Sequence, residues 1–359
     1  MPIKFKSKIA CVALLLFGCN FVNVQEGAYS SYSPYSVFGM GDICRQGTVY
    51  NLSMGGTGIA SRNHRFINYL NPAAITARDT LSFMMDFGLV GEGKLYKQGD
   101  VKSASNLLNI SNVAFTVPIY KKSAFVAGIS PYSSMGYDFS HDITDPSLIG
   151  SVGNINYRSY GEGGVYQIFA GGAATFWNKL SVGAQFLYYF GNIDKSTIMN
   201  FSESSYRDVY SGYILNLNAI GGNFGVQYEQ ALPSGLSLTV GATYKTSSKL
   251  KGYVTDYKYA IVSSVTDTLK YKTDTLSHGS NVKLASEYGV GIALKKGDRW
   301  RAEFNYTRSD WRNSNLENVI GFANAGDAKF STTYSQSFRA GFEIVPNPND
   351  IRYYMRRCS

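Results

Sequence analysis

Apolar and polar residues alternate along most of the chain beyond residue 80, which is the pattern of a β-strand with two different environments on its faces. In residues 81–89 the apolar set is Leu81, Phe83, Met85, Phe87 and Leu89. The same alternation predicts strands at residues 112–119, 180–190, 236–244, 288–294, 300–306 and 338–344. Strands of a soluble β-sandwich are usually about 5–6 residues long, whereas membrane-barrel strands need about 10. The pattern therefore predicts an all-β protein, a transmembrane antiparallel β-barrel.

Turns of two lengths separate these strands. Short polar turns are expected near residues 121–122, 178–179, 233–235, 295–298 and 346–350. Long loops are expected at residues 91–109, 132–160, 193–209 and 252–281. Bacterial barrels have short turns on the periplasmic side and long loops outside. The spacing thus predicts which end of the barrel faces the cell surface.

The predicted barrel over residues 80–359 has about ten long strands, and residues 351–355 look like the start of another. Barrels of this kind generally close with an even number of strands. The chain instead stops at Arg356-Arg357-Cys358-Ser359. We therefore expect a C-terminally truncated chain and an incomplete barrel.

The first 19 residues have the layout of a signal peptide. Lys4, Lys6 and Lys8 precede an apolar run at residues 9–17, which is followed by Gly18 and Cys19. That run is too short to span a bilayer as a helix, which takes roughly 20 residues. Residues 16–19 also resemble a lipoprotein cleavage box, so Cys19 is a candidate lipidation site. The alternative is ordinary cleavage somewhere before residue 29.

Composition supports export to an outer membrane. Charged residues make up 16% of the chain and aromatic residues 14%; soluble domains average roughly 25% charged. Aromatic residues are typical of the girdles of a porin-like barrel. The net charge is +9, but the basic residues are scattered and form no stripe of the kind that binds nucleic acid. We expect a Gram-negative outer-membrane location, with membrane lipids and the barrel assembly machinery as partners.

Residues 29–79 lack the alternation and are rich in Gly, Ser and Asn. Their most specific feature is the run at residues 53–60, with Gly55, Gly56 and Gly58, followed by Asn71-Pro72-Ala73. Glycines permit tight backbone turns, and the residue before a proline avoids the helical region.

This arrangement resembles the N-terminal hatch of the FadL-like outer-membrane transporters of hydrophobic compounds. Residues 33–42 (Ser-Pro-Tyr-Ser-Val-Phe-Gly-Met-Gly-Asp) also resemble the start of FadL-like proteins of the Bacteroidetes. The resemblance implies a barrel of 14 strands when complete, plugged by a hatch at residues 29–79. It further implies that Gly55, Gly56, Gly58, Asn71, Pro72 and Ala73 are hatch residues rather than ligand contacts. Plain turn formation is the alternative role for these six residues.

Two functions follow from the resemblance. The first is passage of hydrophobic small molecules across the outer membrane, through a lumen pocket and movement of the hatch. The second is a non-transporting structural barrel, or one that shuttles substrates as a type IX secretion component. A transporter requires an apolar lumen pocket, whereas a shuttle requires exposed partner-binding surfaces.

No catalytic, cofactor or metal site is predicted, and we do not expect an enzyme. The three histidines, His64, His141 and His278, are far apart and have no second ligand at metal-binding spacing. Asp142, Asp145 and Asp194 form no dense calcium loop. The glycines at residues 55–60 lack the spacing and the flanking strand and helix of a dinucleotide-binding fingerprint.

Overall fold

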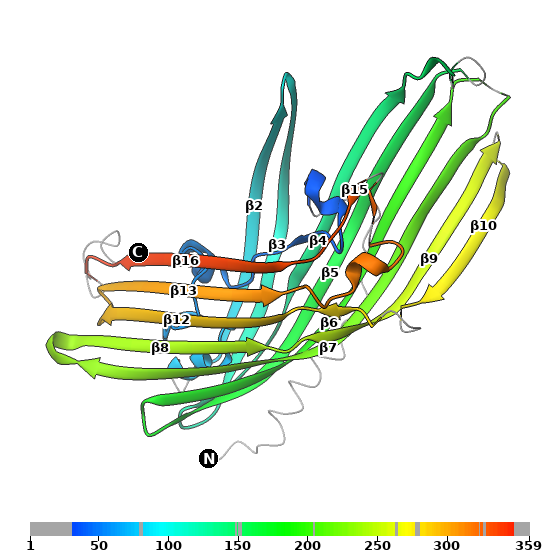
Figure 1. Ribbon diagram of the computed structural model, residues 1–359. Helices are drawn as coiled ribbons and strands as arrows, with labels where there is room; N and C mark the ends of the chain where they lie inside the picture. Colours follow the sequence, from blue (N-terminus) through cyan, green and yellow to red (C-terminus); the bar gives the residue numbers. More distant parts are fainter. Residues whose placement is uncertain are drawn as a thin grey trace.

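The computed structural model describes residues 31–78, 82–147, 149, 153–203, 205–262, 265–276, 281–322, 324–325 and 328–347. Most of them form one antiparallel sheet that curls into an open half-barrel (Figure 1). Ten strands follow one another across the sheet in the order β16-β13-β12-β8-β7-β6-β5-β4-β3-β2. Four further strands attach to this path, β1 to β4, β9 to β7, and both β10 and β11 to β9. The predicted all-β barrel fold is confirmed.

The strands of the main path range from 10 to 25 residues in length. They are β2 (Met84–Gln98), β3 (Val101–Tyr120), β4 (Ser123–Ile143), β5 (Ile155–Phe176), β6 (Leu180–Phe201), β7 (Asp208–Leu232), β8 (Leu236–Lys245), β12 (Ser286–Lys296), β13 (Trp300–Asp310) and β16 (Tyr334–Ile344). The attached strands are β1 (Asp42–Ile43), β9 (Ser248–Val262), β10 (Val265–Thr275) and β11 (Lys283–Leu284).

The remaining elements are short. A separate pair is formed by β14 (Asn324–Ala325) and β15 (Ala328–Lys329). The helices are η1 (Pro34–Val37), α2 (Val49–Ser53), η2 (Pro72–Ala77), η3 (Pro233–Gly235) and η4 (Leu316–Asn318). No helix in the described ranges is long and apolar enough to cross a membrane.

The predicted long loops are largely strand, so this part of the sequence interpretation was wrong. Residues 91–109 form the β2–β3 hairpin, which turns at Gly99-Asp100, and residues 252–281 contain most of β9 and β10. The strands β4, β5 and β6 likewise run through much of the ranges expected at 132–160 and 193–209. Their outer faces are largely polar and their inner faces are apolar only in places, as at Met135 and Ile193, so they lack the regular alternation that marks a strand in lipid. Backbone pairing with their neighbours nevertheless continues.

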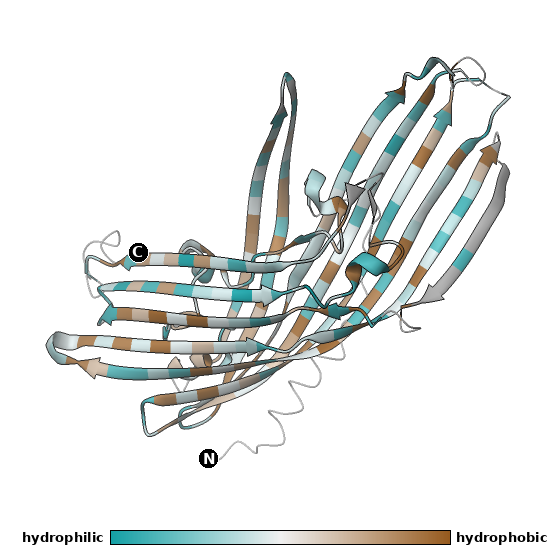
Figure 2. Cartoon of the chain, viewed as in Figure 1, coloured by the Kyte–Doolittle hydropathy of each residue, from teal (hydrophilic) through white to brown (hydrophobic). Residues whose placement is uncertain are grey.

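The outer face of the sheet carries exposed apolar side chains on nearly every strand, at the end of the half-barrel where β8, β12, β13 and β16 lie. They include Phe83, Phe87, Leu108, Ile168, Phe186, Phe224, Val240, Val290, Ile292, Phe304, Phe338 and Phe342. Figure 2 shows the corresponding brown bands alternating with paler residues along the strands. Water would penalise such a surface, whereas lipid would not. The band is therefore the membrane-facing surface of the barrel wall.

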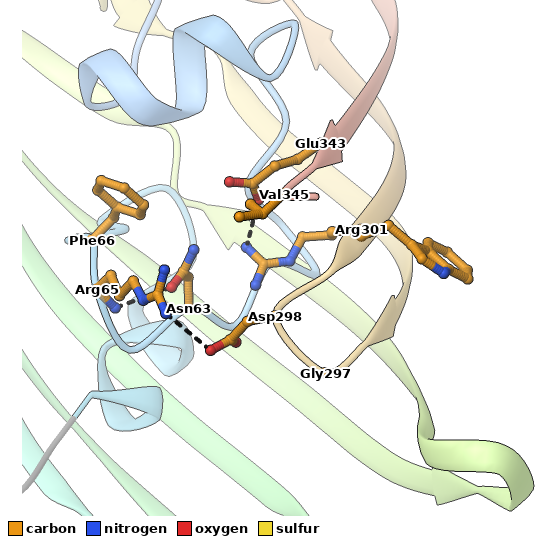
Figure 3. A pocket seen from close by; sticks show the side chains of 9 residues that line it. Asn63, Arg65, Phe66, Gly297, Asp298, Arg301, Glu343 and Val345 are labelled. Atoms are coloured by element: carbon orange, nitrogen blue, oxygen red, sulfur yellow. Dashed lines mark hydrogen bonds and ion pairs between the residues drawn. The ribbon is translucent and has the colours of Figure 1, made fainter. Parts of the chain in front are cut away.

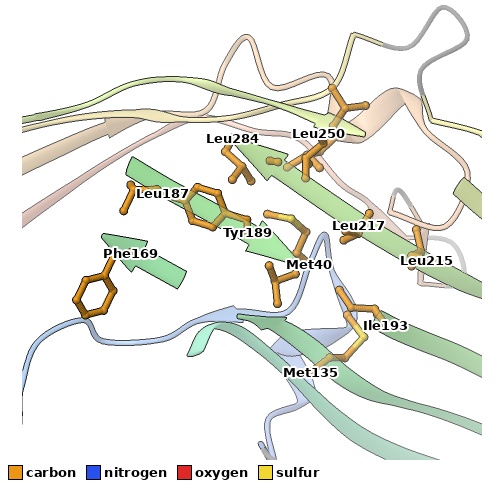
Figure 4. Close-up of a cluster of buried hydrophobic side chains, with 14 of the residues drawn as sticks. Met40, Met135, Phe169, Leu187, Tyr189, Ile193, Leu215, Leu217, Leu250 and Leu284 are labelled. Carbon is orange, nitrogen blue, oxygen red and sulfur yellow. The ribbon is translucent and has the colours of Figure 1, made fainter. Parts of the chain in front are cut away.

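The inner face holds an apolar cluster, mainly where β4 to β7 and β9 extend past the shorter strands. Figure 4 shows Met40 of the N-terminal segment among Met135, Ile193, Leu215 and other wall residues. Leu316 and Phe322, from the connection between β13 and β16, belong to the same cluster. Phe322 and Leu215 are fully buried. Side chains of the protein itself thus fill this part of the interior.

Because the apolar band faces lipid, the loss of stability caused by introducing a charged residue should depend on its position. Val290→Lys, in the middle of the apolar band, should lower the free energy of unfolding by about 2–4 kcal/mol because lysine is poorly tolerated at the bilayer midplane. Tyr253→Lys, on β9 beyond the band, should cost less than about 1 kcal/mol. Denaturant unfolding of the full-length protein in lipid vesicles measures both. Equal costs at the two positions would contradict the assignment.

Candidate functional site

The N-terminal segment, residues 31–78, lies against the inner face of the sheet. Its helix η2 contacts β4, β5, β6 and β7, and η1 contacts β4. Residue Ser33 donates its backbone N–H to the carbonyl of Gly136 on β4 at 2.8 Å. On the other side, the Tyr32 hydroxyl lies 2.6 Å from the Ser103 hydroxyl on β3. The segment therefore bridges β3 and β4, which pair with each other only over residues 113–120 and 123–129.

Asn71 is fully buried and organises the centre of this segment. Its side-chain oxygen caps η2 by accepting the N–H of Ala73 at 3.0 Å, while its Nδ2 donates to the Ile59 carbonyl at 2.7 Å. Pro72 occupies the first turn of η2, where its missing N–H is not needed. Ala73 is also fully buried. The Asn-Pro-Ala motif is thus a helix-capping unit that ties residue 59 to residue 73.

The wall makes room for this motif with glycines. A Cβ on Gly225 of β7 would overlap the Asn71 side chain, and one on Gly183 of β6 would lie 2.6 Å from the Pro72 carbonyl carbon. The segment can approach the strand backbones this closely only because side chains are absent there.

The three glycines of residues 55–58 are constrained in two ways. Gly55 and Gly56 have φ angles of +70° and +79°, which favour glycine over any other residue. Gly58 has an ordinary φ, but a Cβ there would lie 2.7 Å from both Asn51 Nδ2 and Leu70 Cδ1. All three therefore shape the tight turn that carries the segment past β16 and β13. Their predicted role as hatch residues stays a prediction.

Arg62 fastens the segment to β6 and β7. Its guanidinium forms an ion pair with Glu229 at 3.1 Å and donates to Ser181 and Gln227 at 2.8 and 3.1 Å. Only 8% of the Arg62 side chain is exposed. Burial lowers the pKa of Arg62, and Glu229 opposes that shift. Glu229 also pairs with Lys295 of β12 at 2.8 Å. This arrangement is called the Arg62 clamp below.

A second fastening holds α2 to the far side of the sheet. Tyr50 donates its hydroxyl to Glu343 of β16 at 2.7 Å and accepts a hydrogen bond from Arg301 of β13 at 2.5 Å. Arg301 and Glu343 also face each other at 3.8 Å (Figure 3). Burial raises the pKa of the Tyr50 phenol to about 12, with Arg301 opposing. The group is called the Tyr50 clamp below.

Between the two clamps, backbone groups of residues 59–61 contact polar side chains of the wall. Glu303 of β13 accepts the Ala60 N–H at 3.0 Å, and Gln227 of β7 donates to the Ile59 carbonyl at 2.8 Å. Glu303 and Gln227 are 4% and 1% exposed. The segment is therefore hydrogen-bonded to the wall from β6 across to β16.

A cavity of about 360 Å³ remains above the segment, on the side of β12, β13 and β16. Polar residues of those strands and of the end of β8 line one wall, among them Lys245, Glu287, Asn305 and Arg339. The opposite wall is more apolar and includes Ile43, Leu70, Tyr132 and Tyr189. A smaller, open depression near the turn at Gly297 is lined by Asn63, Arg65 and Phe66 (Figure 3).

Sequence reasoning missed the residues that hold the segment in place. Arg62, Glu229, Arg301, Glu303 and Glu343 are separated in sequence by up to 281 positions, and only the curl of the sheet brings them together. The available signal was a carboxylate or guanidinium on the inward face of a predicted strand, because a lone charge there requires a partner.

Several predicted features cannot be placed. Cys19 and the signal peptide at residues 1–19 lie outside the described residues, as does His278. His141 lies in β4 rather than in a loop. Within the described ranges, no three His, Cys, Asp or Glu side chains gather where they could hold a metal ion.

The Arg62 clamp predicts a strong effect of one substitution. Arg62→Ala should lower the free energy of unfolding by about 2–3 kcal/mol, because it removes the buried hydrogen bonds of the guanidinium to Gln227 and Ser181 and one of the two ion pairs of Glu229. Arg65→Ala removes an exposed pair with Asp298 and should cost less than about 1 kcal/mol. Urea titration of both variants in the same lipid checks this. A cost at Arg62 no larger than that at Arg65 would refute the clamp.

The glycine contacts predict a steric effect. Gly225→Ala should displace Asn71 and cost about 1–3 kcal/mol, as overpacking usually does. In Gly172→Ala, the nearest atom to the added Cβ is 3.6 Å away, so this matched strand substitution should be nearly neutral. Limited proteolysis of residues 45–78, followed by mass spectrometry, should show faster cleavage only in Gly225→Ala. Unchanged cleavage would contradict the close docking.

Comparison with solved structures finds proteins of the same fold. The Ralstonia pickettii toluene transporter TbuX is 17% identical, with a TM-score of 0.51 over 87% of this chain and 84% of that one. The CymD monoaromatic hydrocarbon channel is 15% identical, with a TM-score of 0.50 over 86% and 81%. At these identities the likeness concerns the fold alone, and it confirms the predicted FadL-like barrel fold.

The sequence itself matches no curated protein at a significant level. A family model does match, and it covers residues 6–359. Because this match spans nearly the whole sequence, the chain belongs to the BamG family.

Proposed function

We propose that this protein is an outer-membrane barrel with a closed lumen, and that it acts by binding a protein partner at the cell surface. The proposal rests on one observation. The N-terminal segment is bound to the wall at two points, by the Arg62 clamp and by the Tyr50 clamp. Both clamps must break together, and water must hydrate all of their charged groups, before the segment can leave the wall. A hatch held this way is poorly suited to frequent opening.

The interior above the segment supports the same conclusion. Met40, Leu316 and Phe322 of the protein itself belong to the same buried apolar cluster in the lumen as Ile193 and Leu215. The cavity beside this cluster has a polar wall on β12, β13 and β16 and a more apolar wall opposite it.

The long strands supply a surface for a partner. Strands β5, β6 and β7 have 22, 22 and 25 residues, whereas β12, β13 and β16, which have 11, are long enough to cross a bilayer. At about 3.3 Å per residue, the additional length is roughly 35–45 Å along each strand. By the inferred orientation, this extension projects from the cell surface.

Tyrosines gather on the outer face of this extension. The rings of Tyr210 (β7) and Tyr259 (β9) stack with centroids 5.0 Å apart, and Tyr257 lies 5.9 Å from Tyr259. Arg158 lies over Tyr160 on β5 at 5.4 Å. Side chains alternate between the two faces of a strand, so these tyrosines lie on the outer face of the sheet, away from the buried Leu215, Val254 and Val165. Tyrosine and arginine are enriched at protein interfaces, which supports a protein partner.

The proposal predicts that a protein partner crosslinks only to the part of the wall that extends beyond the apolar band. A photoreactive residue replacing Tyr259 should give one defined protein adduct in intact cells, while the same residue at Tyr188, in the lipid-facing band, should give none. The barrel assembly machinery is the first partner to test. Adducts at both positions or at neither would contradict partner binding through this face.

Passage of hydrophobic compounds is the second candidate function, favoured by the 360 Å³ cavity and by the fold shared with TbuX and CymD. Vesicles containing the full-length protein should then take up a labelled monoaromatic hydrocarbon faster than empty vesicles. The closed-lumen proposal expects no difference. Uptake that rises in Arg62→Ala, with none in the native protein, would show that the clamp is what closes the route.

A further inference from the structure

Exposed cations gather at the end of the half-barrel where the short turns lie (Figure 1). Turn by turn along the sheet they are Lys121 and Lys122 (β3–β4), Lys179 (β5–β6), and Lys296 and Arg299 (β12–β13). None of the five forms an ion pair with a carboxylate in the described part of the chain. This group is called the basic rim below.

The turns that carry the basic rim lie against one another. Lys122 donates to the side-chain oxygen of Asn178 in the next turn, and Lys179 donates to that of Gln230 on β7 at 3.1 Å. Glu229 in turn donates its backbone N–H to the Lys179 carbonyl at 2.9 Å. Neutral amides therefore hold both lysines in place without cancelling their charge.

Carboxylates beside these turns are engaged by other cations. Glu229 pairs with Arg62 and Lys295 at 3.1 and 2.8 Å, and Asp298 pairs with Arg65 at 3.2 Å. None of these three cations belongs to the basic rim. The rim therefore keeps its positive charge, and it is complementary to an anion from outside the chain.

Aromatic side chains stand next to the lysines of the rim. Trp177 is 83% exposed and Tyr120 is 73% exposed, and the rings of Phe176 and Trp177 have centroids 6.3 Å apart. Trp177 and Asn178 have φ angles of +47° and +60°, a left-handed turn that glycine or asparagine adopts readily and a bulky residue does not. Contacts within the described chain do not repay this strain, because Trp177 is almost fully exposed. A contact outside the chain would repay it.

The basic rim lies at the edge of the membrane-facing surface. Ile119 on β3 and Phe176 on β5 are exposed beside the turns, and Val182 on β6, three residues after Lys179, is exposed on the same outer face. Cations and tryptophan at such a boundary lie at the level of the lipid head groups. By the inferred orientation the short turns face the periplasm, so these head groups belong to the inner leaflet.

We propose that the basic rim is a binding site for anionic phospholipids of the inner leaflet, with the lysines on the phosphate groups and Trp177 among the head groups. In zwitterionic lipids the amine cancels the charge that the rim recognises. An acidic protein would offer the same charge, but Ile119 and Phe176 place the rim directly against lipid. Neither the closed lumen nor the partner-binding face requires such a site.

Quenching of Trp177 by brominated lipids identifies the lipids around the rim. The full-length protein, with every tryptophan except Trp177 replaced by Phe, is placed in phosphatidylcholine vesicles that contain increasing fractions of brominated phosphatidylglycerol. Phosphatidylglycerol should be enriched at the rim about tenfold or more, since each lysine near an anionic surface contributes roughly a fivefold preference. Lys121→Gln, Lys122→Gln and Lys179→Gln together should abolish the enrichment.

Lys97→Gln, Lys102→Gln and Lys258→Gln together are the matched control, because these exposed lysines lie on β2, β3 and β9 far from the short turns. They should leave the enrichment unchanged. Heat-modifiable gel migration establishes that each variant is folded. If the single-tryptophan protein is not, native mass spectrometry with the native tryptophans in place counts the retained phosphatidylglycerol, which should fall only in the variant of the rim.

Equal quenching by brominated phosphatidylglycerol and brominated phosphatidylcholine overturns the proposal, as does an enrichment that the rim variant does not lower more than the control. Greater enrichment of lipid A than of phosphatidylglycerol would assign the rim to the outer leaflet. Protection of Trp177 from the brominated lipid by polyglutamate would assign it to an acidic protein. Either of these results also overturns the proposal.

Discussion

The interior of this barrel depends on the attachment of one irregular segment to the wall through buried charge. Arg62 sits among Glu229, Gln227 and Ser181, and its desolvation is offset only if all of these groups stay in place. That requirement determines where residues 59–62 lie. Their position in turn places Asn71 against Gly225 and Ala60 against Glu303.

The wall and the segment are adapted to each other in shape as well as in charge. Glycines of the wall, such as Gly183 and Gly225, stand where the segment approaches, and glycines of the segment, such as Gly55, stand where the wall approaches. The outer face follows a different rule, since lipid selects only for apolar side chains of any shape. One sheet therefore has a specific inner surface and an unspecific outer one, as expected for a filled barrel.

The same difference explains what could be predicted from sequence. Strands β12, β13 and β16 were recognisable because lipid on one face produces strict alternation, as in Tyr288, Val290 and Ile292. The upper parts of β4 to β7 and of β9 were missed because water on the outer face removes that contrast. The Asn71-Pro72-Ala73 motif was recognised from its local chemistry. Arg62 and Glu229, 167 positions apart, could not be paired without the curl of the sheet.

The central claim is that residues 50–77 are a fixed part of the barrel and not a mobile gate. Hydrogen–deuterium exchange of the membrane-embedded protein tests it most directly. The account predicts that the amides of residues 59–62 and 73–74 exchange as slowly as those of the wall strands β6 and β7. Exchange of these amides at the rate of surface loops, while β6 and β7 stay protected, would contradict it.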